Sequence, residues 1–159
     1  MSAPPIRVGV VGTGALGFHH ARLLSRMPGV GFSGIYDKNP ARGAEVAQQL
    51  GTVAHPTLAA LLDRVDAVTV AVPTPAHAEV GRAVLERGIG LLMEKPLADT
   101  LAGAEDLVRC AAERGVVLQV GHVERFNRAV RAAAPYLDEP RFLQIDRLAP
   151  FQPRGTTWP

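Results

Sequence analysis

A short apolar run that leads into three closely spaced glycines constrains this 159-residue chain more than any other feature. Residues 6–11 contain four β-branched side chains, as is typical of a buried parallel strand. Gly12, Gly14 and Gly17 follow with G-x-G-x-x-G spacing, and apolar residues then recur at helical intervals. In this pattern the first glycine permits a tight turn, the second lets the backbone approach a pyrophosphate, and the third lets the helix pack closely on the strand.

A second apolar run, residues 31–36, ends in Asp37, about twenty residues after Gly17. An acid at that place accepts hydrogen bonds from ribose hydroxyls and repels a 2′-phosphate, which favours NAD over NADP. The positive charges of Lys38 and Arg42 close by weaken this preference. The alternative is that Asp37 only caps a turn. We therefore expect a dinucleotide site made of Gly12, Thr13, Gly14, Ala15, Leu16, Gly17 and Asp37.

Composition limits the class of the chain. Its length suits one well-cored domain, and its 47% hydrophobic and 20% charged residues are typical of soluble globular proteins. No run reaches the length of a membrane span, the first residues do not resemble a signal peptide, and scattered basic residues with few aromatic ones do not indicate nucleic-acid binding. The single cysteine, Cys110, favours the cytoplasm, and we expect it to be buried on a helix. No metal site is predicted.

Strand-like and helix-like segments alternate along most of the chain. The predicted strands are residues 6–11, 31–36, 53–54, 66–72, 89–93 and 116–120. The predicted helices include 41–50, which Asn39 caps and Gly51 ends, 57–62, one that ends at 87, one from the cap Thr100 to 114, which Gly115 ends, and 124–137. This alternation predicts an α/β fold with a doubly wound parallel sheet, the Rossmann NAD(P)-binding type. We expect a dinucleotide-binding domain over residues 1–122. Residues 123–159 should hold a helix and the start of a second α+β domain, with a strand at 141–148.

Small, polar and proline residues gather where the predicted strands end. These carboxyl ends carry residues 12–17, Asp37, 73–77, 94–96 and 121–126. In an open parallel sheet such ends share one edge, where the ligand crevice forms. We therefore expect the chemistry of this chain at that edge.

Lys95 is the best candidate for a catalytic residue. Only two of the 17 basic residues are lysines, and an ammonium can lose a proton where a guanidinium cannot. Pro96 restricts the loop that follows a buried strand, which would hold the ammonium against a substrate oxygen. The alternative is a surface ion pair between Glu94 and Lys95.

The histidines allow more than one interpretation. His77 follows two prolines and either reaches the crevice edge or is an ordinary surface histidine. His122, at the end of a predicted strand, has the same two interpretations. His19 and His20 follow the glycine loop on a helix, and we do not expect them to be catalytic.

Four segments occur in the order of a known family: residues 12–17 (GTGALG), 72–77 (VPTPAH), 93–97 (MEKPL) and 121–127 (GHVERFN). Together they resemble the glucose–fructose oxidoreductase, inositol dehydrogenase and rhizopine catabolism (Gfo/Idh/MocA) oxidoreductases. The resemblance implies hydride transfer between a nicotinamide and a hydroxyl of a sugar, nucleotide sugar or cyclitol. Residues 147–156 are similar to the tail of one branch of this family, the bacterial UDP-N-acetylglucosamine 3-dehydrogenases.

The resemblance also implies roles for individual residues. Lys95 would contact the reacting hydroxyl and assist its proton transfer, and Glu94 would lie beside the nicotinamide ribose. Outside the glycine loop and Asp37, the implied cofactor contacts are Pro73, Thr74, His77, Glu94 and Lys95. The implied substrate contacts are Lys95, His122 and Arg125.

Two departures from the family pattern bear on activity. Arg128 stands where the family usually has a proline. Family enzymes also carry a C-terminal α/β domain that supplies an Asp-x-x-x-His motif and commonly the homodimer interface, and this sequence holds only the start of it. We therefore expect NAD binding with little or no turnover by this chain alone.

Two other hypotheses remain open at this point. A non-catalytic nucleotide-binding or interaction module would have a partner that covers apolar residues such as Phe142, Phe151 and Trp158. An S-adenosylmethionine-dependent methyltransferase would also have a glycine loop and an acid after its second strand. Gly17 and the Glu-Lys-Pro sequence argue against the methyltransferase.

Overall fold

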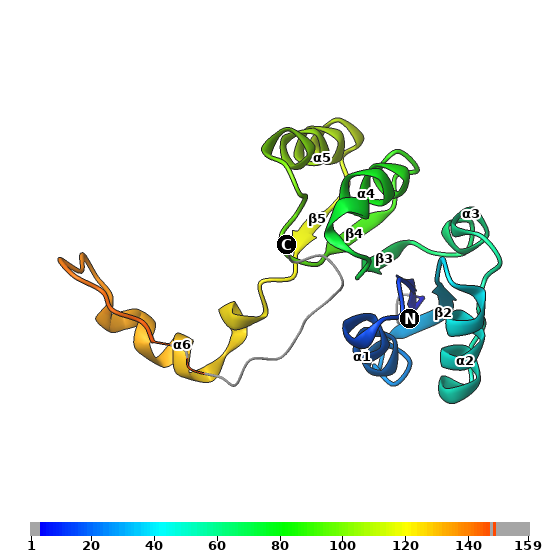
Figure 1. The fold of residues 1–159 in the computed structure, drawn as a ribbon, viewed down its shortest axis with the longest axis horizontal. Coiled ribbons are helices and arrows are strands. Elements are labelled where there is room, and N and C mark those ends of the chain that lie inside the picture. Colours follow the sequence, from blue (N-terminus) through cyan, green and yellow to red (C-terminus); the bar gives the residue numbers. More distant parts are fainter. Residues whose placement is uncertain (1–3, 147, 149–159) are drawn as a thin grey trace. The chain divides into compact units, whose positions relative to one another are not determined.

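The computed structural model describes residues 4–146 and Leu148, and the chain divides into two compact units, residues 1–121 and 122–159. The first unit is built on a five-stranded parallel sheet with the order β2-β1-β3-β4-β5 (Figure 1). Its strands are β1 (Ile6–Val11), β2 (Val30–Tyr36), β3 (Ala67–Val70), β4 (Gly90–Met93) and β5 (Leu118–Val120). The predicted α/β fold with a parallel sheet is confirmed.

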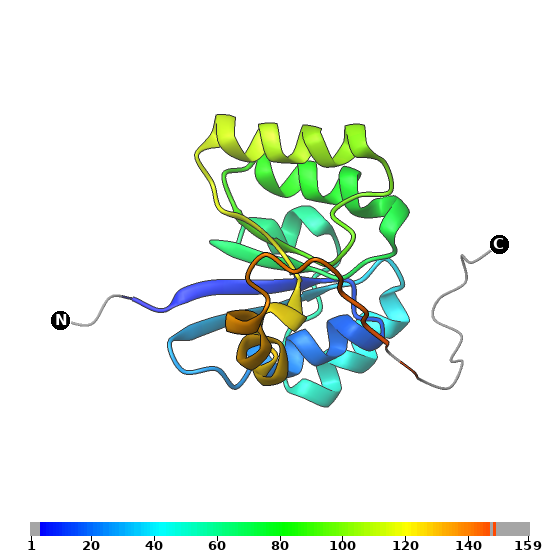
Figure 2. The same ribbon diagram turned by 90° about the vertical axis from the view of Figure 1, so that its left-hand side faces the viewer.

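Helices cover both faces of this sheet. They are α1 (Ala15–Leu24), α2 (Pro40–Leu50), α3 (Leu58–Leu62), α4 (His77–Leu85) and α5 (Leu101–Arg114), with a 3₁₀ turn η1 (Thr74–Ala76) before α4. In Figure 2, α4 and α5 lie on one side of the sheet and α1 and α2 on the other, as in a doubly wound fold. None of the helices in the described part of the chain is long and apolar enough to cross a membrane.

Two hydrophobic cores lie on the two sides of the sheet. Val10 packs with Ala21 and Ile35 beneath α1 and α2, whereas the next residue, Val11, belongs to the larger cluster beneath α3, α4 and α5. Successive side chains of a strand point to opposite faces, and each fully buried valine contributes about 1.5–3 kcal/mol of stability. Cys110 is buried in the larger cluster, as predicted.

The predicted strand at 53–54 is reduced to a single parallel bridge between Ile35 and Ala54. The backbone N–H of Ile35 donates to the carbonyl of Val53 at 2.9 Å, and that of His55 donates to the carbonyl of Ile35 at 2.8 Å. With this bridge counted as a strand, the order becomes the 3-2-1-4-5-6 of Rossmann folds. The strand order reverses between β1 and β3, which is where such sheets bind ligands.

The ends of α2 and α5 follow the predicted capping residues. The side chain of Asn39 accepts hydrogen bonds from two N–H groups of the first turn of α2, and Thr100 accepts one from Gly103 in α5. Gly51 and Gly115 end the two helices in the left-handed conformation, each with φ of 64°. Glycine adopts this conformation without the steric cost that a Cβ imposes.

In the second unit, the helix predicted over 124–137 is broken into three short pieces. These are η2 (Val123–Phe126), α6 (Arg128–Ala133) and η3 (Ala134–Tyr136). Asn127 interrupts the helix, because its backbone is extended (φ −64°, ψ 128°) and its side chain caps α6 by accepting a hydrogen bond from the N–H of Ala129. A continuous helix was therefore a wrong prediction.

The strand predicted over 141–148 is also absent from the part of it that the structure describes, residues 141–146 and Leu148. A strand is stabilised by the ladder of hydrogen bonds to a neighbour, and none of the described strands pairs with these residues. The apolar residues of this segment alone did not suffice to form a strand. Arg147 and the apolar residues Phe151 and Trp158 lie outside the described residues.

Candidate cofactor site

The glycine loop between β1 and α1 has the geometry that its spacing predicts. Gly12 has φ of 82°, and a Cβ there would lie 2.8 Å from Val72 Cγ1 and 2.9 Å from the carbonyl oxygen of Ala71. A Cβ on Gly17 would lie 1.8 Å from the carbonyl oxygen of Gly12, so only glycine lets α1 pack this closely on the turn. A Cβ on Gly14 would meet no atom within 4 Å. The loop is thus packed on its inner side and open where a ligand would approach.

Asp37 locks this loop to the end of β2. Its Oδ2 accepts hydrogen bonds from the backbone N–H and the hydroxyl of Thr13, both at 2.7 Å, and its Oδ1 accepts one from the N–H of Asn39 at 2.8 Å. Thr13 is completely buried. A carboxylate has about four acceptor positions, so about one remains for a ribose hydroxyl. Asp37 therefore does cap a turn, and it does so while facing the loop.

A positive charge stands beside the same loop. The guanidinium Nε of Arg42 donates to the carbonyl oxygen of Thr13 at 3.0 Å, and its Nη1 lies 2.8 Å from Glu45 Oε2. Both contacts hold the Arg42 side chain over the backbone of the loop. The carboxylate of Asp37 and the guanidinium of Arg42 thus face Thr13 from two sides.

His77 ties together two loops at the carboxyl edge of the sheet. The side chain is buried, with Nε2 3.0 Å from the carbonyl oxygen of Val72 and Nδ1 2.8 Å from that of Pro96. The surface interpretation of His77 is therefore wrong. Pro73 and Thr74 lie between Val72 and His77 in the chain, in the turn that leads into α4. His77 thus holds the β3–α4 turn against the residues that follow Lys95.

Glu94 and Lys95 have opposite environments at the end of β4. Glu94 is 6% exposed, and its Oε2 accepts a hydrogen bond from the backbone N–H of Lys95 at 3.2 Å. A Cβ on Gly121 would lie 2.8 Å from Glu94 Oε1, so the end of β5 closes over this carboxylate. Lys95 is exposed, and among the described residues its ammonium forms no ion pair. The alternative interpretation, a surface ion pair between Glu94 and Lys95, is therefore not supported.

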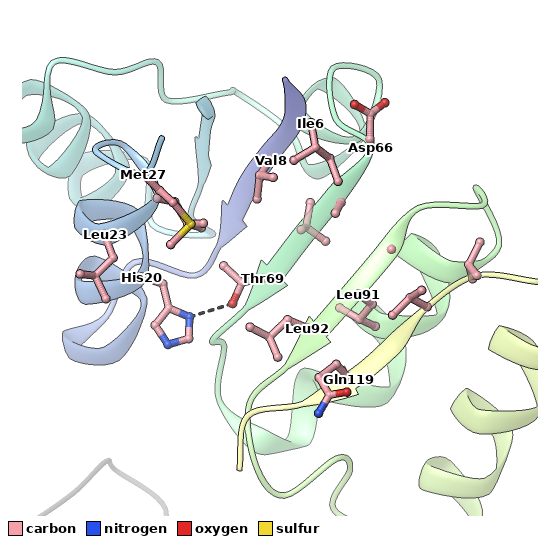
Figure 3. Close-up of a pocket in the computed structure, with 16 residues that line it drawn as sticks. Ile6, Val8, His20, Leu23, Met27, Asp66, Thr69, Leu91, Leu92 and Gln119 are labelled. Carbon is pink, nitrogen blue, oxygen red and sulfur yellow. Dashed lines mark hydrogen bonds between the residues drawn. The ribbon is translucent and has the colours of Figure 1, made fainter. Parts of the chain in front are cut away.

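The sequence interpretation missed the role of His20. Its Nε2 lies 3.3 Å from Glu94 Oε1, and its Nδ1 lies 2.7 Å from the hydroxyl of Thr69 (Figure 3). Burial lowers the pKa of His20, and the charge of Glu94 opposes that shift. Helical spacing is the sequence signal that could have placed His20 against the sheet. Residue 20 lies three positions after Gly17 and one before Ala21, the two buried residues of α1, and so shares their side of the helix.

An apolar pocket of about 670 Å³ lies on the sheet face next to α1 (Figure 3). Most of its lining consists of aliphatic side chains from α1 and from β1, β3, β4 and β5, with His20 and Thr69 among the few polar residues. Such a lining offers few donors for a pyrophosphate, so this pocket suits a dinucleotide less well than the loops at the strand ends.

His122 and Arg125 belong to the second unit, where both are exposed. Arg125 lies in η2, and His122 directly precedes it. Their predicted contact with the substrate remains a prediction. The first unit itself brings together the glycine loop, Asp37, residues 72–77 and residues 94–96 at one edge of the sheet.

Comparison with known proteins identifies the family. Residues 6–122 match the sequence profile of the Gfo/Idh/MocA group, described as an oxidoreductase family with an NAD-binding Rossmann fold. The chain belongs to the Gfo/Idh/MocA oxidoreductase family. This match supports the dehydrogenase interpretation over the methyltransferase one, and NAD is the cofactor of the matched domain.

Several Gfo/Idh/MocA relatives are similar to this chain. UDP-N-acetylglucosamine 3-dehydrogenase from Acidithiobacillus ferrooxidans is 38% identical over 155 residues, which cover 94% of this chain and 48% of the relative. A crystal structure of that enzyme superposes with a TM-score of 0.79 at 36% identity, covering 82% of this chain and 43% of the other. Inositol 2-dehydrogenase from Rubrobacter xylanophilus is 37% identical over 126 residues, which are 77% of this chain and 36% of the relative.

A structure that holds the cofactor is also similar. GenD2 from gentamicin A biosynthesis, solved in complex with NAD, has a TM-score of 0.79 and 33% identity, covering 87% of this chain and 40% of the other. This Gfo/Idh/MocA chain therefore spans at most about half the length of these relatives. The open space at Gly14, the left-handed turn at Gly12 and the close helix packing at Gly17 fit a bound dinucleotide.

Proposed function

We propose that the first unit of this chain binds NAD for hydride transfer to or from a hydroxyl of a sugar, a nucleotide sugar or a cyclitol. The observation that carries this proposal is the glycine loop, open at Gly14 and locked to Asp37 through Thr13, at the point where the strand order reverses. The likeness to UDP-N-acetylglucosamine 3-dehydrogenase and to inositol 2-dehydrogenase supports the substrate class.

The residues of the crevice would divide the work of binding. Backbone N–H groups of the loop and the N-terminus of α1 would hold the pyrophosphate, and the free acceptor position of Asp37 would take a ribose hydroxyl. Pro73 and Thr74, anchored by His77, and the buried Glu94 would border the rest of the cofactor. When bound, NAD⁺ would accept the hydride and NADH would donate it.

Lys95 is the residue that we propose for proton transfer. Its ammonium is exposed at the crevice edge and free of ion pairs among the described residues, while its backbone is held by Glu94 and, through Pro96, by His77. In oxidation, the neutral amine of Lys95 would take the proton of the reacting hydroxyl as the hydride leaves, and in reduction its ammonium would donate a proton to the carbonyl oxygen. His122 and Arg125 would contact the rest of the substrate.

Positioning of the substrate would need more than this chain. Because the chain spans about half of its relatives, we propose that it binds NAD and turns over slowly or not at all by itself. We also propose that the protein is cytoplasmic and that the whole protein forms a homo-oligomer. The non-catalytic module remains the second candidate, since it would share the cofactor site.

The experiment is a fluorescence titration of the purified chain with NADH and, separately, with NADPH. We expect saturable binding that is tighter for NADH, because Asp37 disfavours a 2′-phosphate. Absence of binding by a chain that melts cooperatively would contradict the proposal. Incubation with NAD⁺ and UDP-N-acetylglucosamine or myo-inositol, followed by absorbance at 340 nm, should show little NADH, and rapid formation of NADH would refute the proposed inactivity.

A further inference from the structure

His20 joins three elements of the candidate site. It extends from α1, the helix that starts at the glycine loop, to the hydroxyl of Thr69 in β3 and to the carboxylate of Glu94 at the end of β4. Its side chain is only 16% exposed, and that of Glu94 is 8% exposed. A neutral hydrogen-bonding partner for a buried carboxylate must be oriented correctly, because a misplaced donor leaves the charge unsatisfied.

The partners of His20 favour one position for the proton of a neutral ring. His20 Nε2 lies 3.3 Å from Glu94 Oε1, and because a carboxylate only accepts, this contact is favourable when Nε2 carries the proton. The second oxygen of Glu94 accepts a hydrogen bond from the N–H of Lys95. A neutral ring with its proton on Nε2 then accepts at Nδ1, where the hydroxyl of Thr69 donates. One tautomer therefore satisfies all of these groups.

We propose that His20 is a positioning residue of the cofactor site, which as the neutral Nε2–H imidazole holds the carboxylate of Glu94 in place at the carboxyl edge of the sheet. This inference rests on the proposed function, in which Glu94 borders the bound NAD. His20 touches Glu94 from the same helix whose first turn faces the pyrophosphate site. It would thereby couple the position of the glycine loop to the orientation of Glu94.

The first test needs no cofactor. Long-range ¹H–¹⁵N correlation spectra distinguish the tautomers of neutral histidine, and the exposed neighbour His19 is an internal control. We expect His20 to be the Nε2–H tautomer in the wild type, with a lower population of that tautomer in Glu94→Gln and in Thr69→Val. A His20 ring with its proton on Nδ1, or one unaffected by both substitutions, would overturn the proposal.

The second test uses a matched pair of variants. The amide of asparagine can take the place of Nδ1 and keep the contact with Thr69, whereas that of glutamine can take the place of Nε2 and keep the contact with Glu94. We expect His20→Gln to bind NADH within about twofold of the wild type and His20→Asn to bind it about five- to tenfold more weakly.

The outcomes separate this inference from the proposed function. Equal NADH affinity in the two variants would show that His20 only packs α1 against the sheet and would overturn the positioning role. If the wild type did not bind NADH, the proposed function and with it the positioning role would fail. The tautomer measurement would still show whether the contacts of His20 with Thr69 and Glu94 exist. Melting curves of both variants would show whether they fold alike.

Discussion

Replacement of Asp37 by alanine tests how the glycine loop is held. The substitution removes three hydrogen bonds, two from Thr13 at 2.7 Å and one from Asn39 at 2.8 Å. The two donors of Thr13 are in a residue that is completely buried, so water does not replace the carboxylate without a local rearrangement. The variant therefore tests the stability of the fold as well as the binding of a ribose.

The structure gives the size of the expected effect. Hydrogen bonds to a charged partner contribute about 1.5–3 kcal/mol each, and some of the loss is recovered by relaxation and by water at the exposed Asn39. We expect Asp37→Ala to lose about 3–5 kcal/mol of unfolding free energy, a large part of the roughly 5–15 kcal/mol of a typical domain. The midpoint of thermal unfolding should fall by about 10 °C.

Urea unfolding followed by circular dichroism measures this change, and Asp99→Ala is the control. Asp99 is exposed and lies in the β4–α5 connection, away from the glycine loop, so its replacement should cost less than about 0.5 kcal/mol. Thr13→Val removes only the hydroxyl bond, and combining it with Asp37→Ala should add almost nothing, because that bond is already lost. A loss below about 1 kcal/mol in Asp37→Ala, or additive losses in the double variant, would refute this account of the loop.

Three further predictions concern other parts of the first unit. Gly17→Ala should fail to fold or lose more than about 3 kcal/mol of stability in a urea melt, because its Cβ would lie 1.8 Å from a backbone oxygen; a native-like melt would contradict this. His77→Phe keeps a planar aromatic ring but removes both carbonyl contacts, so the Lys95 amide should exchange with deuterium roughly tenfold faster, and unchanged exchange would show that His77 does not hold that loop. The hydrogen bonds and charge of Arg7 lower the pKa of Asp66 from 3.8 to about 2, so the stability that this pair adds is present above pH 3.8 and is lost as the pH falls through about 2. Carboxyl NMR should show this low pKa in the wild type and a value near 3.8 in Arg7→Met, and equal values would exclude the pair as its cause.

The elements that sequence predicted well are those whose ends depend on local chemistry. The glycine loop, the caps Asn39 and Thr100 and the terminating Gly51 and Gly115 each act within a few residues, so their geometry follows from residue type. The strands β1 and β3 were found because most of their residues are apolar and buried.

The predictions that failed depend on distant partners. The segment 141–148 contains several apolar residues, but a strand also needs a neighbour, which residue type does not provide. The contacts of His20 and His77 were not predicted because their partners, Glu94 and the carbonyl of Pro96, are far away in the sequence. Sequence predicted which loops gather at the carboxyl edge of the sheet, and only the fold showed which of their side chains meet there.

The most direct test of the account is the affinity of NADH for the wild type and for Gly14→Ala, measured together with the unfolding curve of each. A Cβ at residue 14 touches nothing in the folded chain and stands where the pyrophosphate would approach. We predict that the variant unfolds within about 1 kcal/mol of the wild type and binds NADH at least about tenfold more weakly. Equal affinity in both proteins, or no binding by a wild type that unfolds cooperatively, would contradict the assignment of this loop as the NAD site.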